Sequence, residues 1–120
     1  MKQALLVICI AILPVALIIS CSKSGPGNDD DGAATDCNAV SKKFATDVNP
    51  IIQAFCNQAA CHNSGSTNGP GQLTNYTEVF NARIVIRQAV RSGLMPKNAT
   101  LSTAQKNAII CWIDSGAPNN

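Results

Sequence analysis

The sequence predicts a small all-α domain of three to four helices, preceded by an apolar leader and a polar connector. Two observations predict the helices: apolar residues recur at helical spacing in two segments and follow a capping box in a third, and no run of four or more residues alternates between apolar and polar as a half-buried strand would. A third observation divides the chain, because 16 apolar residues fall in residues 1–20, 3 in residues 21–36 and 36 in residues 37–120.

The first element is a helix through residues 44–55. Its apolar side chains fall on one face: Phe44, Val48, Ile51, Ile52 and Phe55. Asn49-Pro50 interrupts this stripe, and a proline inside a helix predicts a kink or a restart at that point. Residues 63–75 follow and consist mostly of turn-forming residues, so we expect a loop there, with Leu73 and Tyr76 as its apolar anchors.

Two further helices follow this loop. The first has an apolar stripe at Ala82, Ile86, Ala89 and Val90. The last begins with a capping box, Ser102 with Gln105 three residues later, and stops at Gly116. Its run of apolar residues from 108 to 113 predicts burial on several sides.

The length and composition restrict the class of protein. Residues 37–120 leave room for one domain only. They hold 21 large apolar residues, a thin supply that small domains supplement with disulfides, metals or cofactors. They also carry seven basic against three acidic groups, a net charge of +4. This weak, unclustered excess excludes a nucleic-acid-binding surface.

The leader, residues 1–20, is typical of a bacterial signal peptide. Lys2 precedes an apolar stretch, Ala4–Ile19, that is too short for an ordinary membrane span and contains Pro14. The end of the leader, Ser20-Cys21, resembles the lipobox of bacterial lipoproteins, which implies that Cys21 is lipidated and becomes the first residue after cleavage. The alternatives are an ordinary cleaved signal peptide and an uncleaved anchor.

The connector, residues 21–36, has the composition of a flexible acidic tether. The 15 residues after Cys21 reach at most about 50 Å when fully extended. We therefore expect an exported domain, residues 37–120, that works close to the membrane to which its lipid anchor attaches it. The expected location is the bacterial cell envelope, on its periplasmic or outer face.

The string CNQAACH, residues 56–62, carries the chemistry of a covalent haem site. A c-type haem needs two thiols and an imidazole directly after the second thiol, and Cys56, Cys61 and His62 supply all three. The common attachment motif has two residues between the cysteines, whereas this chain has four, Asn57–Ala60. On a continuous helix five positions would not place both thiols on one face, so we expect Asn57–Ala60 to bulge outward.

Met95 is the candidate for the second axial ligand of a haem iron. It is the one methionine that remains once the leader is removed, and it lies in the loop sequence Gly93-Leu94-Met95-Pro96. The residue before a proline is directed away from helical conformation, so this loop can present the thioether at a fixed place. A single methionine elsewhere would more often fill the core.

Residues 44–117 resemble the cytochrome c domains of bacterial envelope lipoproteins. The matching features are, in order, an aromatic-Asp-Val-x-Pro-Ile lead-in (residues 44–51), Cys56 and Cys61-His62, Leu73, Tyr76, Met95-Pro96, Leu101-Ser102, and a last helix ending in residues 112–117. The resemblance implies one covalent haem c, thioether bonds to Cys56 and Cys61, His62 as proximal ligand and Met95 as distal ligand. It also implies an electron carrier rather than an enzyme, with redox proteins of a respiratory or envelope chain as partners.

Cys37 and Cys111 are the two thiols left once lipid and haem are assigned. We expect them to form a disulfide, because an exported protein seldom keeps a free pair. In cytochrome c domains the first and last helices cross, which would bring the approach to the first helix near the middle of the last. The alternative is a pair of buried, reduced thiols.

Other functions fit some of these residues. Cys56, Cys61 and His62 with Cys37 or Cys111 form the ligand set of a structural zinc site, although a thiolate directly before the imidazole is strained around one ion. A thiol–disulfide module and a disulfide-stabilised lipoprotein without cofactor are two further alternatives. A haem peroxidase or sensor is the fourth, but it lacks a second histidine.

Arginines at Arg83, Arg87 and Arg91 repeat at helical spacing. We expect a solvated helix face. The alternative is a contact with haem propionates or with an acidic redox partner.

Overall fold

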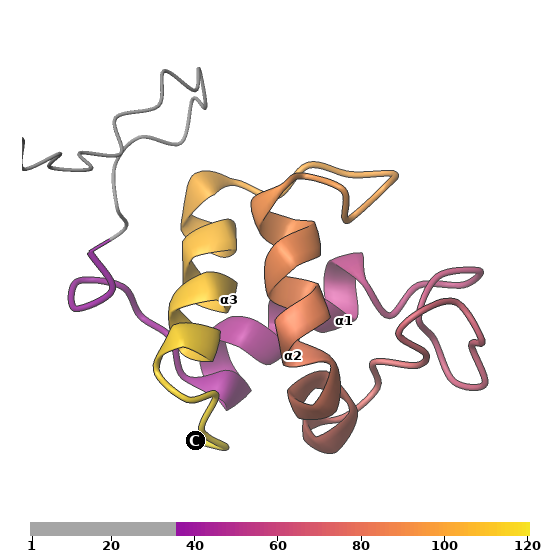
Figure 1. Ribbon diagram of the computed structural model, residues 1–120, viewed down its shortest axis with the longest axis horizontal. Coiled ribbons are helices and arrows are strands. Elements are labelled where there is room, and N and C mark those ends of the chain that lie inside the picture. Colours follow the sequence, from indigo (N-terminus) through magenta and orange to yellow (C-terminus); the bar gives the residue numbers. More distant parts are fainter. Residues whose placement is uncertain (1–35) are drawn as a thin grey trace, which may run out of the picture. The chain divides into compact units, whose positions relative to one another are not determined.

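The computed structural model describes residues 36–120, which belong to one compact unit. The predicted leader, Cys21 and the rest of residues 1–35 lie outside the described residues. The described part has no strand and consists of a π-helical turn and three α-helices: η1 (Phe44–Val48), α1 (Asn49–Phe55), α2 (Tyr76–Arg91) and α3 (Thr103–Asp114) (Figure 1). The predicted all-α class is confirmed for these residues. None of their helices is long and apolar enough to cross a membrane.

The first predicted helix is divided into η1 and α1. Val48 N donates to Lys43 O at 3.2 Å, and Asn49 N donates to Phe44 O, so this turn is one residue wider than an α-helical turn. Pro50 lies at the start of α1, where its missing N–H costs no helical hydrogen bond. The restart expected at Asn49-Pro50 is therefore confirmed.

Capping side chains set the starts of α2 and α3. Asn75 Oδ1 accepts a hydrogen bond from Glu78 N at 3.1 Å, and α2 begins at the next residue, Tyr76, where the predicted loop ends. The capping box of α3 is present in both directions, because Gln105 N donates to Ser102 Oγ at 3.2 Å and Ser102 N donates to Gln105 Oε1 at 2.9 Å.

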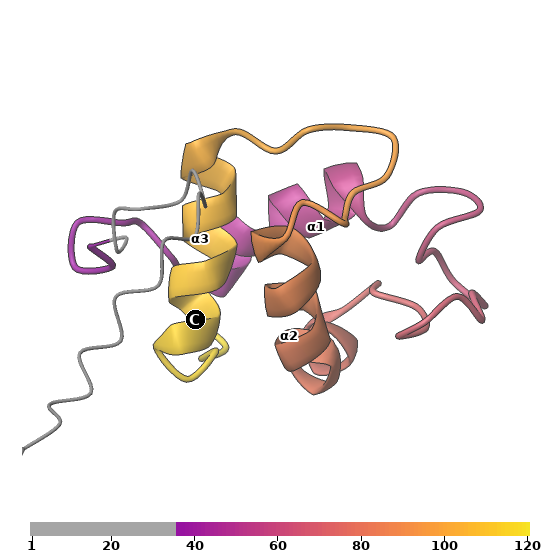
Figure 2. The same ribbon diagram turned by 45° about the horizontal axis from the view of Figure 1, so that its top comes forward.

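The core lies where α3 packs against α2 and η1 (Figure 2). Its fully buried side chains come from all four elements: Val48, Ile52, Val79, Val90, Ile109 and Trp112. An aromatic cluster extends the core, in which the ring of Phe44 lies 5.0 Å from that of Tyr76 and 5.3 Å from that of Trp112. Such ring pairs stabilise a fold beyond the area that they bury.

The C-terminal residues close this core. Ala117 O accepts a hydrogen bond from the Tyr76 hydroxyl, and Pro118 O accepts one from Trp112 Nε1, both at 2.9 Å. Asn120 O accepts from Ala45 N at 2.8 Å, at the first turn of η1. The chain end thereby satisfies donors that the aromatic cluster and η1 would otherwise leave unpaired.

Cys37 and Cys111 form a disulfide, as predicted. Their Cα atoms lie 5.3 Å apart, and 74 positions separate them in the sequence. Cys111 is fully buried in α3. The bond therefore joins the start of the domain to the C-terminal half of its last helix.

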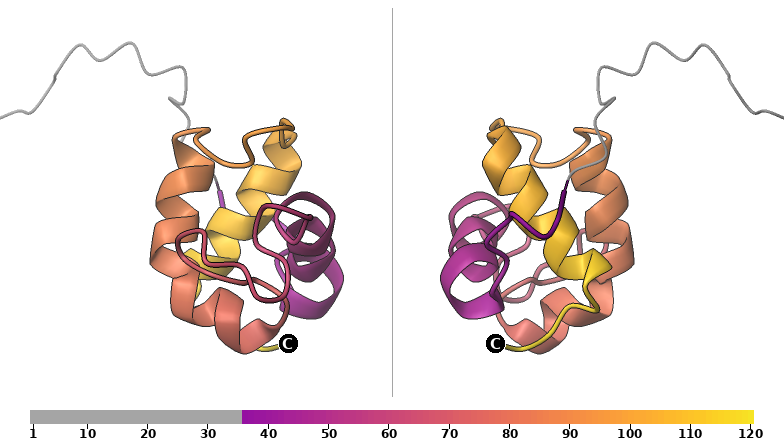
Figure 3. Two further views of the ribbon diagram at one scale, coloured as in Figure 1. Left: turned by 90° about the vertical axis from the view of Figure 1, so that its right-hand side faces the viewer. Right: turned by 90° about the vertical axis from the view of Figure 1, so that its left-hand side faces the viewer.

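Two long loops, residues 56–75 and 92–102, extend beyond the helices. Figure 3 (left) shows the first loop crossing the face between α2 and α1, with the second running from α2 to α3 above it. These loops carry all the residues predicted to bind a haem.

Candidate functional site

The predicted haem residues line one cavity. Its volume is about 1180 Å³, and its lining includes Cys56, Cys61, His62 and Met95. Cofactor and ligand sites usually measure roughly 300–1,000 Å³, so this cavity is large enough for a cofactor. The fold thus brings Met95 to a space shared with a cysteine–histidine segment far from it in the sequence.

His62 is buried, with 6% of its surface exposed, and one of its ring nitrogens forms a hydrogen bond. Its Nδ1 lies 2.8 Å from Gly71 O, and a carbonyl oxygen can only accept, so Nδ1 carries the proton. Among residues 36–120 the structure shows no hydrogen bond to Nε2. Histidine ligands of metals commonly have this arrangement, with one ring nitrogen donating to a carbonyl and the other free to coordinate.

The segment between the two cysteines is a loop rather than a continuation of α1. The helix ends at Phe55, and His62 N then donates to Cys56 O at 3.1 Å. This hydrogen bond closes the loop by joining its last residue to its first. The bulge predicted for Asn57–Ala60 is confirmed. Both thiols are free, and burial, with a smaller contribution from Cys61, raises the pKa of Cys56 to about 11.

Met95 reaches the cavity because α2 ends abruptly. Gly93 adopts a φ of 70°, a left-handed conformation that glycine tolerates and that commonly ends helices. Met95 N then donates to Ala89 O at 3.1 Å, which turns the loop back against the last turn of α2. Met95 is partly buried there, whereas its neighbour Leu94 is 64% exposed.

The walls of the cavity are mainly apolar. Phe55, Leu73, Ile86 and Val90 all line it. Val85 and Leu94 line it too, and they are two of the three large apolar side chains that are most exposed in the described part of the chain. Lys97 is the one charged residue of the lining. An apolar cofactor in this space would cover side chains that otherwise contact water.

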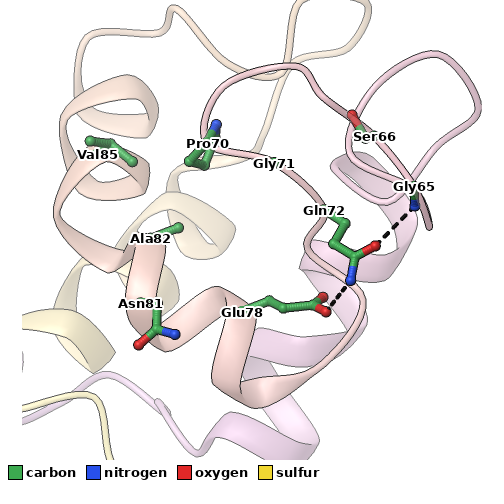
Figure 4. Close-up of a pocket in the computed structure, with 9 residues that line it drawn as sticks. All are labelled: Gly65, Ser66, Pro70, Gly71, Gln72, Glu78, Asn81, Ala82 and Val85. Carbon is green, nitrogen blue, oxygen red and sulfur yellow. Dashed lines mark hydrogen bonds between the residues drawn. The ribbon is translucent and has the colours of Figure 1, made fainter.

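A network of hydrogen bonds fastens the loop wall to α2 beside a second cavity of about 600 Å³ (Figure 4). Gln72 Oε1 accepts from Gly65 N at 2.9 Å, and Gln72 Nε2 donates to Glu78 Oε1. Glu78 Oε2 accepts from Thr74 N at 2.7 Å and also from the Thr74 hydroxyl. These hydrogen bonds, that of Thr74 N first, hold the pKa of Glu78 below its ordinary value. No motif or periodicity in the sequence indicates Gln72 or Glu78.

The arginine row is not a free positive surface. Arg87 forms two hydrogen bonds with Asp114, at 2.6 and 2.9 Å, and the guanidinium of Arg83 lies 4.0 Å from the ring centre of Phe80. None of the three arginines lines the cavity. Arg87 is therefore used in a contact between α2 and α3 and Arg83 in a contact within α2, and the alternative of an arginine contact with propionates gains no support from the lining.

The zinc alternative loses its fourth ligand, because Cys37 and Cys111 are bonded to each other. Within residues 36–120 no three His, Cys, Asp or Glu side chains gather into a group that could hold a metal ion. A haem needs no such group, since its porphyrin supplies four ligands and the protein adds only the axial ones.

Comparisons of the chain with protein-family models, with curated proteins and with solved structures found no match.

Proposed function

We propose that this protein is a membrane-tethered mono-haem c-type cytochrome that carries single electrons in the bacterial cell envelope. One observation supports this most strongly: two thiols, an imidazole and a thioether, each of a type that a c-type haem requires, line the same apolar cavity. The orientation of His62 by Gly71 O supports it independently, because this contact cannot be read from the sequence.

Each residue has a distinct role in this proposal. Cys56 and Cys61 would hold the haem through thioether bonds from their sulfur atoms, and His62 Nε2 and Met95 Sδ would bind its iron. The bound haem supplies an iron that cycles between Fe(II) and Fe(III).

The protein controls that iron through its own groups. Gly71 O keeps the proton on Nδ1 of His62, and the hydrogen bond makes the imidazole a stronger electron donor. The apolar walls, with Phe55, Leu73 and Ile86 among them, exclude water around the ligands. With His62 and Met95 both bound to the iron, the site would transfer electrons and offer no open position for a substrate.

In this proposal the leader and the connector determine where in the cell the protein transfers electrons. Ser20-Cys21 and the acidic residues that follow support a lipid anchor and a short tether. A carrier held in this way exchanges electrons with redox proteins at the envelope membrane.

Optical spectroscopy of the full chain, produced in a host that attaches haem c, tests the proposal. We expect a Soret band that stays with the chain after denaturation, and a mass increase of one haem. Met95→Ala should remove the weak long-wavelength sulfur-to-iron band and lower the reduction potential, whereas Leu94→Ala, a neighbour that also lines the cavity, should keep the band. A colourless chain would refute the proposal. Binding of peroxide or carbon monoxide by the unaltered protein would indicate a peroxidase or a sensor instead.

A further inference from the structure

The long spacing between Cys56 and Cys61 creates a physical problem for any double attachment. Two thiols that bind one porphyrin must keep a fixed separation, and fixing the backbone of each residue between them costs roughly 1–2 kcal/mol of conformational entropy. Four residues between the cysteines, rather than two, add to this cost. The chain therefore gains from contacts that order residues 57–60 before a haem arrives.

Asn68 provides such a contact on one side of the bulge. Its Nδ2 donates to Ala60 O at 3.0 Å and to Cys61 O at 2.9 Å. The Ser66 hydroxyl donates to Cys61 O as well. Asn68 thus holds the two carbonyls that directly precede His62, and it lines the same cavity.

The conformation of Ala60 shows that the bulge is held against a local preference. Its φ is 64°, in the left-handed region. A residue with a Cβ pays roughly 1–2 kcal/mol there and remains only where the surroundings impose it. The carbonyl of Ala60 is one of the two that Asn68 binds. The hydrogen bond from Asn68 therefore holds the same residue whose backbone is strained.

Gln58 provides the contact on the other side. Its Nε2 donates to Gln53 O at 2.8 Å and to Ala54 O at 3.0 Å, which are carbonyls at the end of α1 that lack helical partners. Asn57 Nδ2 donates to the side chain of Gln53. The bulge is thus tied at its start to α1 and at its end to residue 68.

We propose that Asn68 and Gln58 are positioning residues that preorganise the four-residue bulge so that Cys56 and Cys61 attach to one haem. This inference rests on the proposed function. The two side-chain amides act by donating hydrogen bonds to carbonyl oxygens. Asn68→Asp has the same shape but no N–H, so it should reduce the double attachment of haem as Asn68→Ala does.

The test compares Asn68→Ala, Asn68→Asp and Gln58→Ala with Asn81→Ala in the full chain. Asn81 is a matched control, because it is exposed on α2, does not line this cavity and forms no side-chain hydrogen bond with other described residues. Mass spectrometry of the haem-carrying peptide counts the thioether bonds. We expect the doubly attached fraction to fall at least threefold in the Asn68 variants and less in Gln58→Ala, with no change in Asn81→Ala.

Hydrogen exchange supplies a measurement that does not require haem. Cys61 N donates to Gln58 O and His62 N to Cys56 O, so both amides report on the bulge. In the full chain, with and without haem, Asn68→Ala should speed their exchange about tenfold and leave α3 unchanged. Adding Ala60→Gly, which removes the strain at φ 64°, should restore part of the protection and of the double attachment.

The two measurements separate the two hypotheses. If no variant takes up haem but Asn68→Ala still speeds exchange at residues 61 and 62, the proposed function fails and the ordering role of Asn68 stands. If haem is attached normally and exchange in Asn68→Ala equals that in Asn81→Ala, the positioning role is refuted.

Discussion

The two halves of the domain are held together by different interactions. In the half built from η1, α3 and the C-terminal residues, side chains such as Val48, Ile109 and Trp112 are fully buried against each other. In the half built from the loops 56–75 and 92–102, the walls surround a cavity, and Val85 and Leu94 remain exposed. Hydrogen bonds between side-chain amides and backbone groups hold the loop of residues 56–75 in place.

This difference indicates which half is complete without a cofactor. The half around α3 has its apolar contacts, its aromatic cluster and its disulfide within the chain itself. The cavity half has ordered walls, but their apolar surface lacks a partner, so an apolar group between them would add contacts that the chain cannot provide. Four predictions test this contrast.

The largest expected effect is the loss of the disulfide. Replacing both cysteines (Cys37→Ser with Cys111→Ser) should lower the free energy of unfolding by about 4 kcal/mol, because the bond closes a long loop in the unfolded chain. Urea unfolding followed by the fluorescence of Trp112 measures this change. An unaltered midpoint would mean that the half around α3 does not depend on this bond.

Matched truncations compare the two halves directly. Ile109→Ala removes a fully buried side chain from α3 and should cost about 3 kcal/mol. Leu94→Ala removes one that is 64% exposed and should cost less than about 0.5 kcal/mol in the haem-free chain. Haem attachment should increase the cost of Leu94→Ala, since a bound cofactor would bury that side chain. Equal costs for both variants in the haem-free chain would contradict the contrast.

Alkylation of Cys56 tests how closely the wall is packed without haem. Burial raises the pKa of this thiol from 9.0 to about 11, and only the thiolate reacts. At pH 8 the folded, haem-free chain should therefore react about 100-fold more slowly at Cys56 than the unfolded chain. The rate should rise tenfold per pH unit up to the pKa. Mass spectrometry of the labelled peptide gives both rates, and similar values would show that the wall is open.

The smallest effect belongs to the ion pair between α2 and α3. Arg87 holds the pKa of Asp114 below its ordinary value of 3.8, but the two side chains are 30% and 40% exposed, and such pairs stabilise by only about 0.5 kcal/mol. Because the folded pKa is lowered, this stability is present above the ordinary value and is lost as the pH falls through the folded pKa. Arg87→Ala should lower the free energy of unfolding by this amount at pH 7, and by progressively less below about pH 4. Urea unfolding at each pH measures this change. Arg91→Ala, the neighbouring control, should have a smaller effect.

Patterns within short segments determined much of this protein from sequence alone. The stripe of residues 44–55 with its proline predicted the divided first helix, and Ser102 with Gln105 predicted the start of α3. Counting thiols predicted the pair Cys37 and Cys111. The helix predictions succeeded because periodicity and capping depend on residue type and on spacing along the chain, whereas the cysteine pair was predicted by elimination. The predicted haem ligands rest on the same kind of pattern.

Only the tertiary structure decided which distant groups meet. It places Met95 on the cavity that His62 lines, aims Gly71 O at the imidazole, and fastens the loop walls through Asn68 and Gln72. Single amides and carbonyls in loops have no periodicity, and their partners depend on how the helices pack. The sequence therefore indicated which side chains are candidates for the site. Packing determined how these side chains are oriented and which neighbours hold them.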